Sequence, residues 1–310
     1  MRAAELAEQA IIEARDDPQA RAQALEVAAV LDMNLDRPRR AAHRADAALA
    51  LYRRSGDAQG RARILDGRAM ATFLDGDITA GVLLFQQVAN LFEDCGDLVR
   101  LVTPRSTRGH ALMFNGQPVA GLADATGALE TARTLGHPEG QAYALWHRSE
   151  ALSALDRADE ASHDAREALA IANRLGHRGW TATGWRAVGI AEQARGDLEA
   201  ALDAFTHSLA CSEHLGLFAS WAAARSASVL VAQGRAALAA PLADRALAQG
   251  PPLGHYEARL AQIDVAAAMG DDRLAGLAAE AQRVAVAGGY RLELRRLADL
   301  AARLGGPAPR

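Results

Sequence analysis

The sequence lacks lysine altogether, so that all 34 of its basic residues are arginines. Without lysine the chain has no residue for a Schiff base and none for the lysine of a phosphate-binding loop. Aromatic residues make up only 5% of the 310 residues, although 50% are hydrophobic and many of these are alanine. Such a composition suits a core in which helices approach one another closely.

Cysteine and long apolar runs are scarce too. The only two cysteines, Cys95 and Cys211, lie far apart, which indicates reduced thiols in a cytoplasmic protein rather than a disulfide framework. The chain opens with a polar helix pattern, and no apolar run is long enough to span a bilayer. The net charge of −4 is spread without a basic stripe. We therefore expect a cytoplasmic protein with neither a membrane nor a nucleic acid as its partner.

The signatures of common catalytic sites are absent from the sequence. It contains no G-x-S-x-G, no phosphate-binding loop, no dinucleotide fingerprint and no H-E-x-x-H. No acid–base or nucleophile pair can be recognised from spacing alone. The sequence therefore predicts a protein that is not an enzyme, with no catalytic residue, no cofactor and no metal site.

What the chain does contain is two columns of turn residues that repeat every 40 residues. The first column comprises Gly56, Gly96, Gly136, Gly176 and Gly216. The second lies half a repeat away and comprises Asp36, Gly76, Gly116, Asp156 and Gly196. A period of this length, held over several cycles, is typical of a stacked repeat array.

Between the two columns, each unit has the pattern of two helices. The seventh residue before and the fifth residue after each member of the second column are small, as at Gly189 and Ala201. Small residues let the axes of two helices approach, while larger neighbours fill the space between turns. Pro38 and Pro118 suit the first turn of the second helix, and the first glycine column suits the left-handed end of that helix.

This pattern resembles the tetratricopeptide repeat, whose helices carry alternating large and small core positions such as Leu145, Ser149, Ala161 and Leu169. The period is similar to the long-helix variety in bacterial signalling ATPases and large LuxR-type regulators. HEAT repeats have a similar period, but the paired small-residue columns favour the tetratricopeptide interpretation. The resemblance implies an all-α, right-handed superhelical solenoid of antiparallel helix pairs, with about seven repeats plus flanking helices.

We expect one continuous array over residues 1–304, followed by a disordered tail at 305–310. The period breaks at Gly254, two residues early, and a Pro-Pro pair precedes that glycine. The preceding helix must therefore end early, which predicts a hinge at 248–254.

Three other segments depart from the pattern. Pro104 falls inside a predicted first helix, which either starts late with Thr103 as its cap or kinks there. Residues 1–15 match a second helix without its first, so that the array would begin in mid-unit. Residues 290–304 suit a final helix that exposes its polar side to solvent.

The resemblance implies that the first helix of each pair, helix A, lines the concave surface of the solenoid. Positions 13, 10, 6 and 3 before each residue of the second column then face inward. Between residues 63 and 193 these positions carry methionine, aromatic and single charged residues, which are typical of a peptide or partner-helix groove. The predicted site comprises Arg63, Asp66, Met70, Phe73, His110, Met113, Tyr143, Trp146, Glu150 and Arg186. The alternative is that these side chains pack against adjacent helices.

A third column consists of Arg68, Arg108 and Arg148, each eight residues before the second column. Three guanidinium groups at one repeat position could form an anion-binding ladder for a carboxylate or phosphate. The alternative is that each head pairs with a neighbouring acidic residue while its stem packs.

The leading interpretation is a non-catalytic scaffold that binds a protein or peptide on the concave helix-A surface. The second is that the chain is the sensing segment of a larger bacterial signalling or transcription regulator, as its start in mid-unit suggests. A small-molecule or anionic ligand is a further alternative, and the sequence leaves the oligomeric state open.

Overall fold

The structure, a computed structural model, describes residues 2–303. Within them the chain forms sixteen α-helices and no strand. The helices are α1 (Arg2–Glu13), α2 (Pro18–Asn34), α3 (Pro38–Ser55), α4 (Ala58–Leu74), α5 (Ile78–Asp94), α6 (Leu98–Phe114), α7 (Pro118–Thr134), α8 (Pro138–Ser153), α9 (Ala158–Leu175), α10 (Arg178–Ala194), α11 (Leu198–Cys211), α12 (Gly216–Ala232), α13 (Ala236–Leu247), α14 (Pro252–Met269), α15 (Leu274–Gly288) and α16 (Leu294–Arg303). The tail expected at 305–310 lies outside the described residues.

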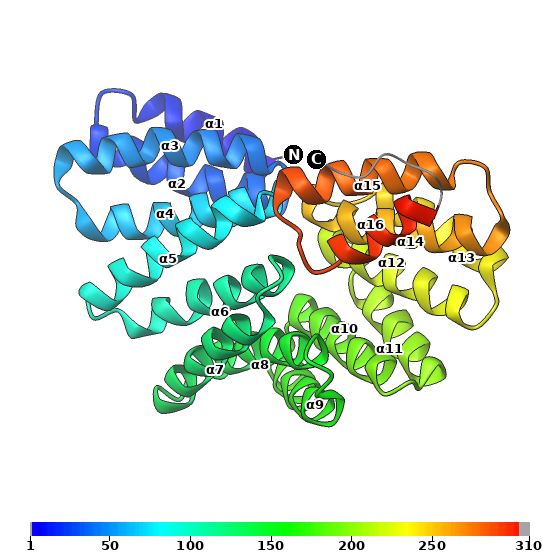
Figure 1. The fold of residues 1–310 in the computed structure, drawn as a ribbon. Helices are drawn as coiled ribbons and strands as arrows, with labels where there is room; N and C mark the ends of the chain where they lie inside the picture. Colours follow the sequence, from blue (N-terminus) through cyan, green and yellow to red (C-terminus); the bar gives the residue numbers. More distant parts are fainter. Residues whose placement is uncertain (1, 304–310) are drawn as a thin grey trace.

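The helices α2 to α15 form seven consecutive pairs, flanked by α1 and α16. Figure 1 shows the pairs following one another around an arc, so that the first repeats and the last helices meet at its opening. The even-numbered helices occupy the inner side of the arc and the odd-numbered ones the outer side. The all-α solenoid of about seven repeats predicted from the sequence is confirmed.

The second column of turn residues has the backbone conformation that its composition predicts. All five members have positive φ, and Asp36 (53°) and Asp156 (58°) are the only residues other than glycine with positive φ in the described chain. Aspartate tolerates the left-handed conformation better than most side chains, and glycine adopts it without steric cost. The turn after each helix A therefore has one fixed shape.

The first glycine column is left-handed at its first four members but not at Gly216. Here the prediction is wrong, because α11 already ends at Cys211 and Gly216 is the first residue of α12. Gly216 lies in a close contact instead, since a Cβ there would lie 2.0 Å from Asp36 Oδ2 and 3.0 Å from the Cα of Gly250. The next turns are at Gly234 and Gly270, so that the period slips before the predicted hinge.

Pro104 lies inside α6, which begins at Leu98 with Asp97 accepting a hydrogen bond from the Arg100 amide. The expectation of a late start capped by Thr103 is therefore wrong. Later in the chain, α13 ends at Leu247 and α14 begins at Pro252, so that the early end of a helix predicted before residues 248–254 is present.

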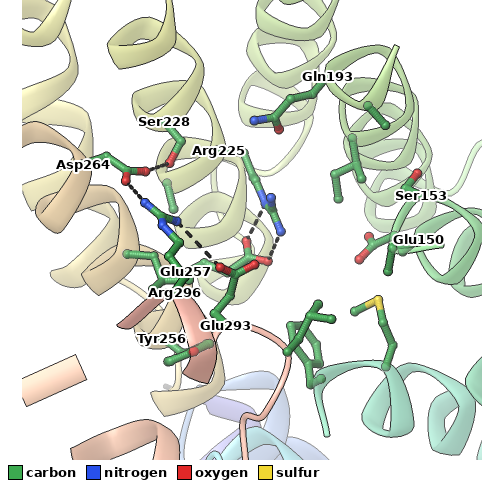
Figure 2. Close-up of a pocket in the computed structure, with 18 of the residues that line it drawn as sticks. Glu150, Ser153, Gln193, Arg225, Ser228, Tyr256, Glu257, Asp264, Glu293 and Arg296 are labelled. Carbon is green, nitrogen blue, oxygen red and sulfur yellow. Dashed lines mark hydrogen bonds and ion pairs between the residues drawn. The ribbon is translucent and has the colours of Figure 1, made fainter. Parts of the chain in front are cut away.

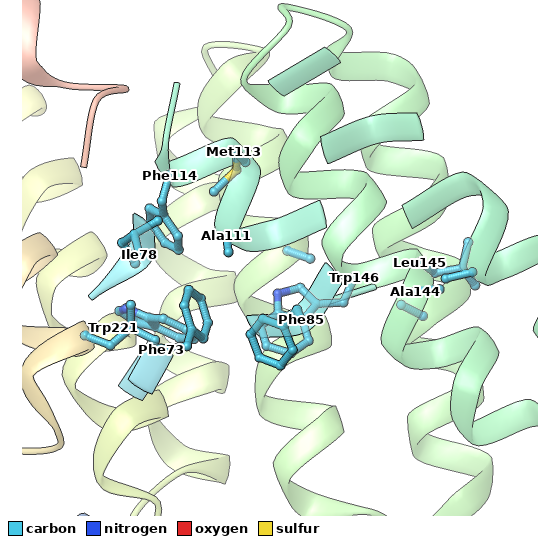
Figure 3. Close-up of a cluster of buried hydrophobic side chains, with 14 of the residues drawn as sticks. Phe73, Ile78, Phe85, Ala111, Met113, Phe114, Ala144, Leu145, Trp146 and Trp221 are labelled. Atoms are coloured by element: carbon cyan, nitrogen blue, oxygen red, sulfur yellow. The ribbon is translucent and has the colours of Figure 1, made fainter. Parts of the chain in front are cut away.

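The largest core cluster runs through the middle of the array and reaches its last helices. Figure 3 shows Phe73, Phe85, Phe114, Trp146 and Trp221 gathered at the inner side of the helix pairs. The same cluster includes residues of α14 and α15, which are far away in sequence. The inner surface of the first units is therefore partly filled by the last ones.

The segment between α15 and α16 contacts the end of α6 and the turn that follows it. The Arg291 amide donates to the Phe114 carbonyl at 2.8 Å, and Asn115 Nδ2 donates to the Gly289 carbonyl at 2.9 Å. Tyr290 is buried and stacks on Tyr256 with ring centroids 4.1 Å apart. We name residues 289–293 the closing segment. The final helix expected within residues 290–304 is present as α16, while the closing segment that precedes it packs inward at Tyr290.

None of the helices in residues 2–303 combines the length and the apolarity needed to cross a membrane.

Candidate functional site

A buried group of ions lies at the centre of the inner surface. The guanidinium of Arg186, on α10, donates from Nε to Glu150 Oε1 at 2.9 Å and from Nη1 to Glu257 Oε2 at 2.9 Å. It also lies 4.5 Å from the ring centroid of Trp221. This one side chain thereby joins α8, α10, α12 and α14. Buried ions remain in a protein only when they are paired and hydrogen-bonded, and each condition is met here.

Glu150 is fully hydrogen-bonded inside this group. Its Oε1 accepts from Trp146 Nε1 at 2.6 Å, and its Oε2 lies 3.1 Å from His110 Nε2. Burial alone would raise the pKa of Glu150, but the charges of Arg186 and His110 outweigh it and hold the pKa well below its ordinary value. Glu150 is therefore ionised at neutral pH.

Glu257 is the second carboxylate of the group and faces the pocket described below. Arg225, on α12, donates from Nη2 to Glu257 Oε1 at 2.9 Å and from Nε to Oε2 at 3.3 Å. Burial acts to raise the pKa of Glu257, but Arg186 and Arg225 together lower it to about 2. Both carboxylates of the group are thus negatively charged at neutral pH.

Two histidines stack beside the ions. The rings of His110 and His147 are 4.5 Å apart with an interplanar angle of 24°, and His147 Nδ1 is 2.8 Å from Ser106 Oγ. Burial, followed by the charge of His110, lowers the pKa of His147 well below its ordinary value. His147 is therefore neutral, and it stabilises the packing of α6 against α8.

A pocket of about 390 Å³ opens next to the ion group. Its volume lies in the range of pockets that bind small molecules or a few residues of a peptide. Figure 2 shows polar side chains from the inner helices converging on it, with α16 forming one wall. The lining residues are Met113, Phe114, Glu150, Ser153, Ala154, Asp156, Ile190, Gln193, Ala194, Ala224, Arg225, Ser228, Tyr256, Glu257, Leu260, Asp264, Leu292, Glu293 and Arg296.

Two hydroxyl groups of the pocket have no partner within the described chain. Tyr256 is only 2% exposed, yet its phenolic oxygen makes no hydrogen bond in residues 2–303. The Oγ of Ser153 is buried and is likewise unbonded there. A buried polar atom without a partner costs free energy, so that a molecule hydrogen-bonded to either hydroxyl would relieve that cost.

Most residues of the predicted groove lie in the interior rather than on an open surface. Phe73, His110, Trp146 and Arg186 are buried among the inner helices, as are Met113 and Glu150. Met113 and Glu150 alone of the predicted set also line the pocket. Tyr143 is partly buried, and its hydroxyl lies 3.0 Å from Thr107 Oγ1. The predicted positions do face inward, but other helices cover most of them.

The predicted residues on α4 lie away from the pocket. Arg63 donates from Nε to Glu26 Oε1 at 2.9 Å, and Met70 packs against the core cluster. One carboxylate oxygen of Asp66 is buried without a hydrogen-bond partner in the described residues. Burial raises the pKa of Asp66 to about 7. This part of the predicted site therefore forms a second polar region on the inner surface.

The arginine column is occupied by local ion pairs. Arg108 Nε lies 2.5 Å from Asp124 Oδ2, and Arg148 Nε lies 2.6 Å from Asp164 Oδ2. In both pairs a second guanidinium nitrogen binds the other carboxylate oxygen. Arg68 pairs with the exposed carboxylate of Asp46 at 2.9 Å. Each guanidinium thus has an acidic partner on a neighbouring helix. This arrangement matches the alternative given in the sequence analysis, local ion pairing, rather than an anion-binding ladder.

Most of the pocket residues missing from the sequence prediction come from beyond residue 216, and the others lie at the ends of α6, α8 and α10 or just after them. The signal for them was present, because the rule of positions 13, 10, 6 and 3 still applies when counted from Gly270, the turn after α14. Those positions include Glu257, Leu260 and Asp264, which all line the pocket. The sequence prediction missed these positions because Gly270 does not fall on the 40-residue period. No repeat position predicts Glu293, because it belongs to the closing segment.

No group of three or more histidine, cysteine, aspartate or glutamate side chains in residues 2–303 is arranged to hold a metal ion.

Comparisons with known proteins find similarity to one family model and to several solved structures. Residues 140–214 match the model of the tetratricopeptide repeat. Among solved structures, the chain is similar to a Rap protein complexed with Competence and Sporulation Factor, with a TM-score of 0.65 and 15% identity over 91% of this chain and 87% of that chain. A comparison with curated proteins gives no match.

Two further solved structures are similar. One is the Rap conjugation gene regulator of the plasmid pLS20 in complex with the Phr* peptide, with a TM-score of 0.60 and 12% identity over 97% of this chain and 93% of that chain. The other is a STAND signal transduction ATPase with a tetratricopeptide repeat sensor from Pyrococcus horikoshii, with a TM-score of 0.51 and 12% identity over 84% of this chain and 38% of that chain. The chain therefore has the fold of tetratricopeptide-repeat proteins, and residues 140–214 match the model of that repeat.

Proposed function

We propose that the protein binds a short peptide segment in the pocket between α6, α8, α10, α12, α14 and α16, and that it acts by binding rather than by catalysis. The observation that carries the proposal is the pocket itself, in which Ser153 and Tyr256 offer unbonded hydroxyls beside apolar walls. A peptide backbone supplies the missing hydrogen bonds, while its side chains fill the apolar part.

The chemistry of the walls supports a peptide. Met113, Phe114, Ile190, Leu260 and Leu292 form the apolar part of the lining. Methionine and aromatic side chains adapt to an apolar partner and supply much of the contact area in recognition sites. Two of the solved neighbours are, by their descriptions, complexes with the Competence and Sporulation Factor and with the Phr* peptide. The proposed site is therefore smaller than a groove along residues 63–193 and lies further toward the last helices.

The test is binding of a random pentapeptide library to the wild type and to Ser153→Trp. Ser153 is the last residue of α8 and lines the pocket, so that an indole there fills the space. We expect the variant to lose library binding while its melting temperature stays close to that of the wild type. The control is Ser55→Trp, at the last residue of α3 on the exposed outer side, which should bind as the wild type does. Equal binding by Ser153→Trp would place the peptide elsewhere.

A second candidate function is that this array is the sensing part of a larger signalling protein. The similarity to the repeat sensor of the STAND ATPase supports it, because this chain covers only 38% of that protein. Peptide binding in the pocket would then be the sensed signal. Sequencing the gene and its flanks, and finding no adjoining output domain, would exclude this candidate without affecting the first.

A further inference from the structure

The side chains that line the pocket carry an excess of negative charge. Five carboxylates line it, whereas two arginines do, and a third arginine, Arg186, lies directly behind. From this excess we propose that the bound peptide presents a cationic group, an arginine or lysine side chain or its amino terminus, to Glu293. The inference rests on the proposed function, since it names the chemistry that the same pocket recognises.

Three of the five carboxylates already form ion pairs with the arginines. Arg186 and Arg225 enclose Glu257, and Arg186 also neutralises Glu150. On the opposite wall Arg296 binds Asp264, whose other oxygen accepts from Ser228 Oγ at 3.0 Å. In these pairs each guanidinium group is already bonded to an acidic side chain of the protein. An anionic ligand would have to displace one of the bound carboxylates.

The remaining charge is carried by Glu293 and Asp156. Asp156 is exposed at the rim, in the turn after α8. The side chain of Glu293 is 35% exposed, and the nearest basic group in residues 2–303 is Arg296 Nη1 at 3.8 Å, a guanidinium already shared with Asp264. A carboxylate beside apolar walls attracts a cation more strongly than one in bulk water, because the local dielectric is lower.

The unbonded hydroxyl of Tyr256 lies on the same side of the pocket as Glu293. Figure 2 shows both side chains near the base of α16. Burial, and after it the charge of Glu293, raises the pKa of Tyr256, so that the phenol stays neutral. A neutral phenolic oxygen accepts a hydrogen bond from an ammonium or guanidinium group. A cation at this position would therefore meet a carboxylate and a free hydroxyl, with the aromatic ring of Phe114 also in the lining.

The experiment uses the random pentapeptide library in two forms, with free and with acetylated amino termini. We expect the strongest binders to be rich in arginine and lysine. Replacing the basic residue of the best acetylated binder by glutamine should weaken binding about tenfold or more, the effect of losing a charge-assisted hydrogen bond. If only the free-amine form binds, the cation is the amino terminus.

Glu293→Gln is the matching protein variant. It should reduce affinity for the basic peptide about tenfold or more and leave affinity for the glutamine peptide unchanged. Glu199→Gln, an acidic residue on the outer helix α11, is the control and should bind the basic peptide as the wild type does. Added salt should weaken binding of the basic peptide to the wild type more than to Glu293→Gln.

The outcomes separate the two proposals. Binders that are neutral or acidic, or a Glu293→Gln variant that keeps its preference for basic peptides, would overturn the cationic ligand and leave peptide binding in place. A library in which no pentapeptide binds, in either form, would overturn the proposed function and this inference with it.

Discussion

The regular units and the last third of the chain are both built from helix pairs, but the turns between their helices differ in what they contact. At the first glycine column, Gly56, Gly96, Gly136 and Gly176 have open space where a side chain would project, so that these turns serve only to reverse the chain. In the last third, Gly216, Gly250 and Gly289 lie against other turns of the arc. The regular period builds the frame, and the departures from it bring distant helices into contact.

The electrostatics of the two regions differ in the same way. In the regular units, arginines of helix A pair with acidic residues of the next helix, as Arg148 does with Asp164. In the last third, Arg225 and Glu257 complete an ion group that starts on α8 and α10. The first kind of pair stabilises one repeat. The second kind joins α8, α10, α12 and α14 and lies beside the pocket.

The largest effect should come from removing the ion that joins the two regions. Arg186→Met leaves Glu150 and Glu257 without their shared partner, and unpaired buried charges typically cost about 3–5 kcal/mol of unfolding free energy. Urea unfolding measures it. Arg133→Met, whose pair with Glu167 is exposed, should cost about 1 kcal/mol or less. Similar losses in both variants would mean that the central ions do not join the regions.

The next effect is on the pH dependence of stability. It contrasts Asp66, which is not paired with an arginine in residues 2–303, with the carboxylates that are. The pKa of Asp66 is raised to about 7 from an ordinary 3.8, so that the folded chain binds its proton more tightly than the unfolded chain. Its contribution to stability is therefore full below about pH 4 and is lost as the pH rises to 7. Asp66→Asn should be more stable than the wild type at pH 8, by at most about 4 kcal/mol, and should show little gain at pH 4.

The control for this pH dependence is Asp159→Asn, at a side chain that is almost fully exposed. Its stability relative to the wild type should hardly change with pH. A gain for Asp66→Asn that is equal at pH 4 and pH 8 would show that the carboxyl group of Asp66 is not enclosed.

A smaller difference should separate two glycines that share one backbone conformation. Gly116 and Gly136 both have positive φ, and alanine costs about 1–2 kcal/mol there. A Cβ at Gly116 would also lie 3.0 Å from Arg291 Cβ, whereas one at Gly136 meets nothing within 4 Å. Gly116→Ala should therefore be the more destabilising, by about 1 kcal/mol in thermal unfolding. Equal costs would argue against a docked closing segment.

The smallest effect should come from a pair inside one repeat. Arg108→Gln removes the partner of Asp124, and we expect a loss of about 1 kcal/mol. Phosphate should not change the melting temperature of the wild type more than that of the variant. A phosphate-dependent rise that disappears in Arg108→Gln would instead establish the anion ladder.

The parts of the structure that repeat could be predicted from the sequence, and the parts that do not repeat could not. The turns at Asp36 and Asp156 could be predicted, because both residues belong to a column that repeats every 40 residues. The inward positions 146, 150 and 186 followed from the same count. What no local pattern contains is the contact between Phe114 and Arg291, since it depends on how the curvature accumulates over the whole array.

That curvature also explains why the predicted groove was placed too near the start of the chain. Helix-A positions between residues 63 and 193 were expected to face open space, but α12, α14 and the closing segment occupy much of it. Trp146 illustrates the change, because it lies in the core cluster and donates to Glu150. The space that remains is at the ends of the inner helices, where Ser153 and Gln193 lie.

The most direct test of peptide binding in the pocket is amide hydrogen exchange with and without the best-binding pentapeptide. We predict slower exchange at the ends of α8 and α10, around residues 150–154 and 190–194, and in the closing segment at 289–293. Exchange on the outer helices α9 and α11 should not change. Protection confined to the outer helices, or to α2 and α4, would contradict the account.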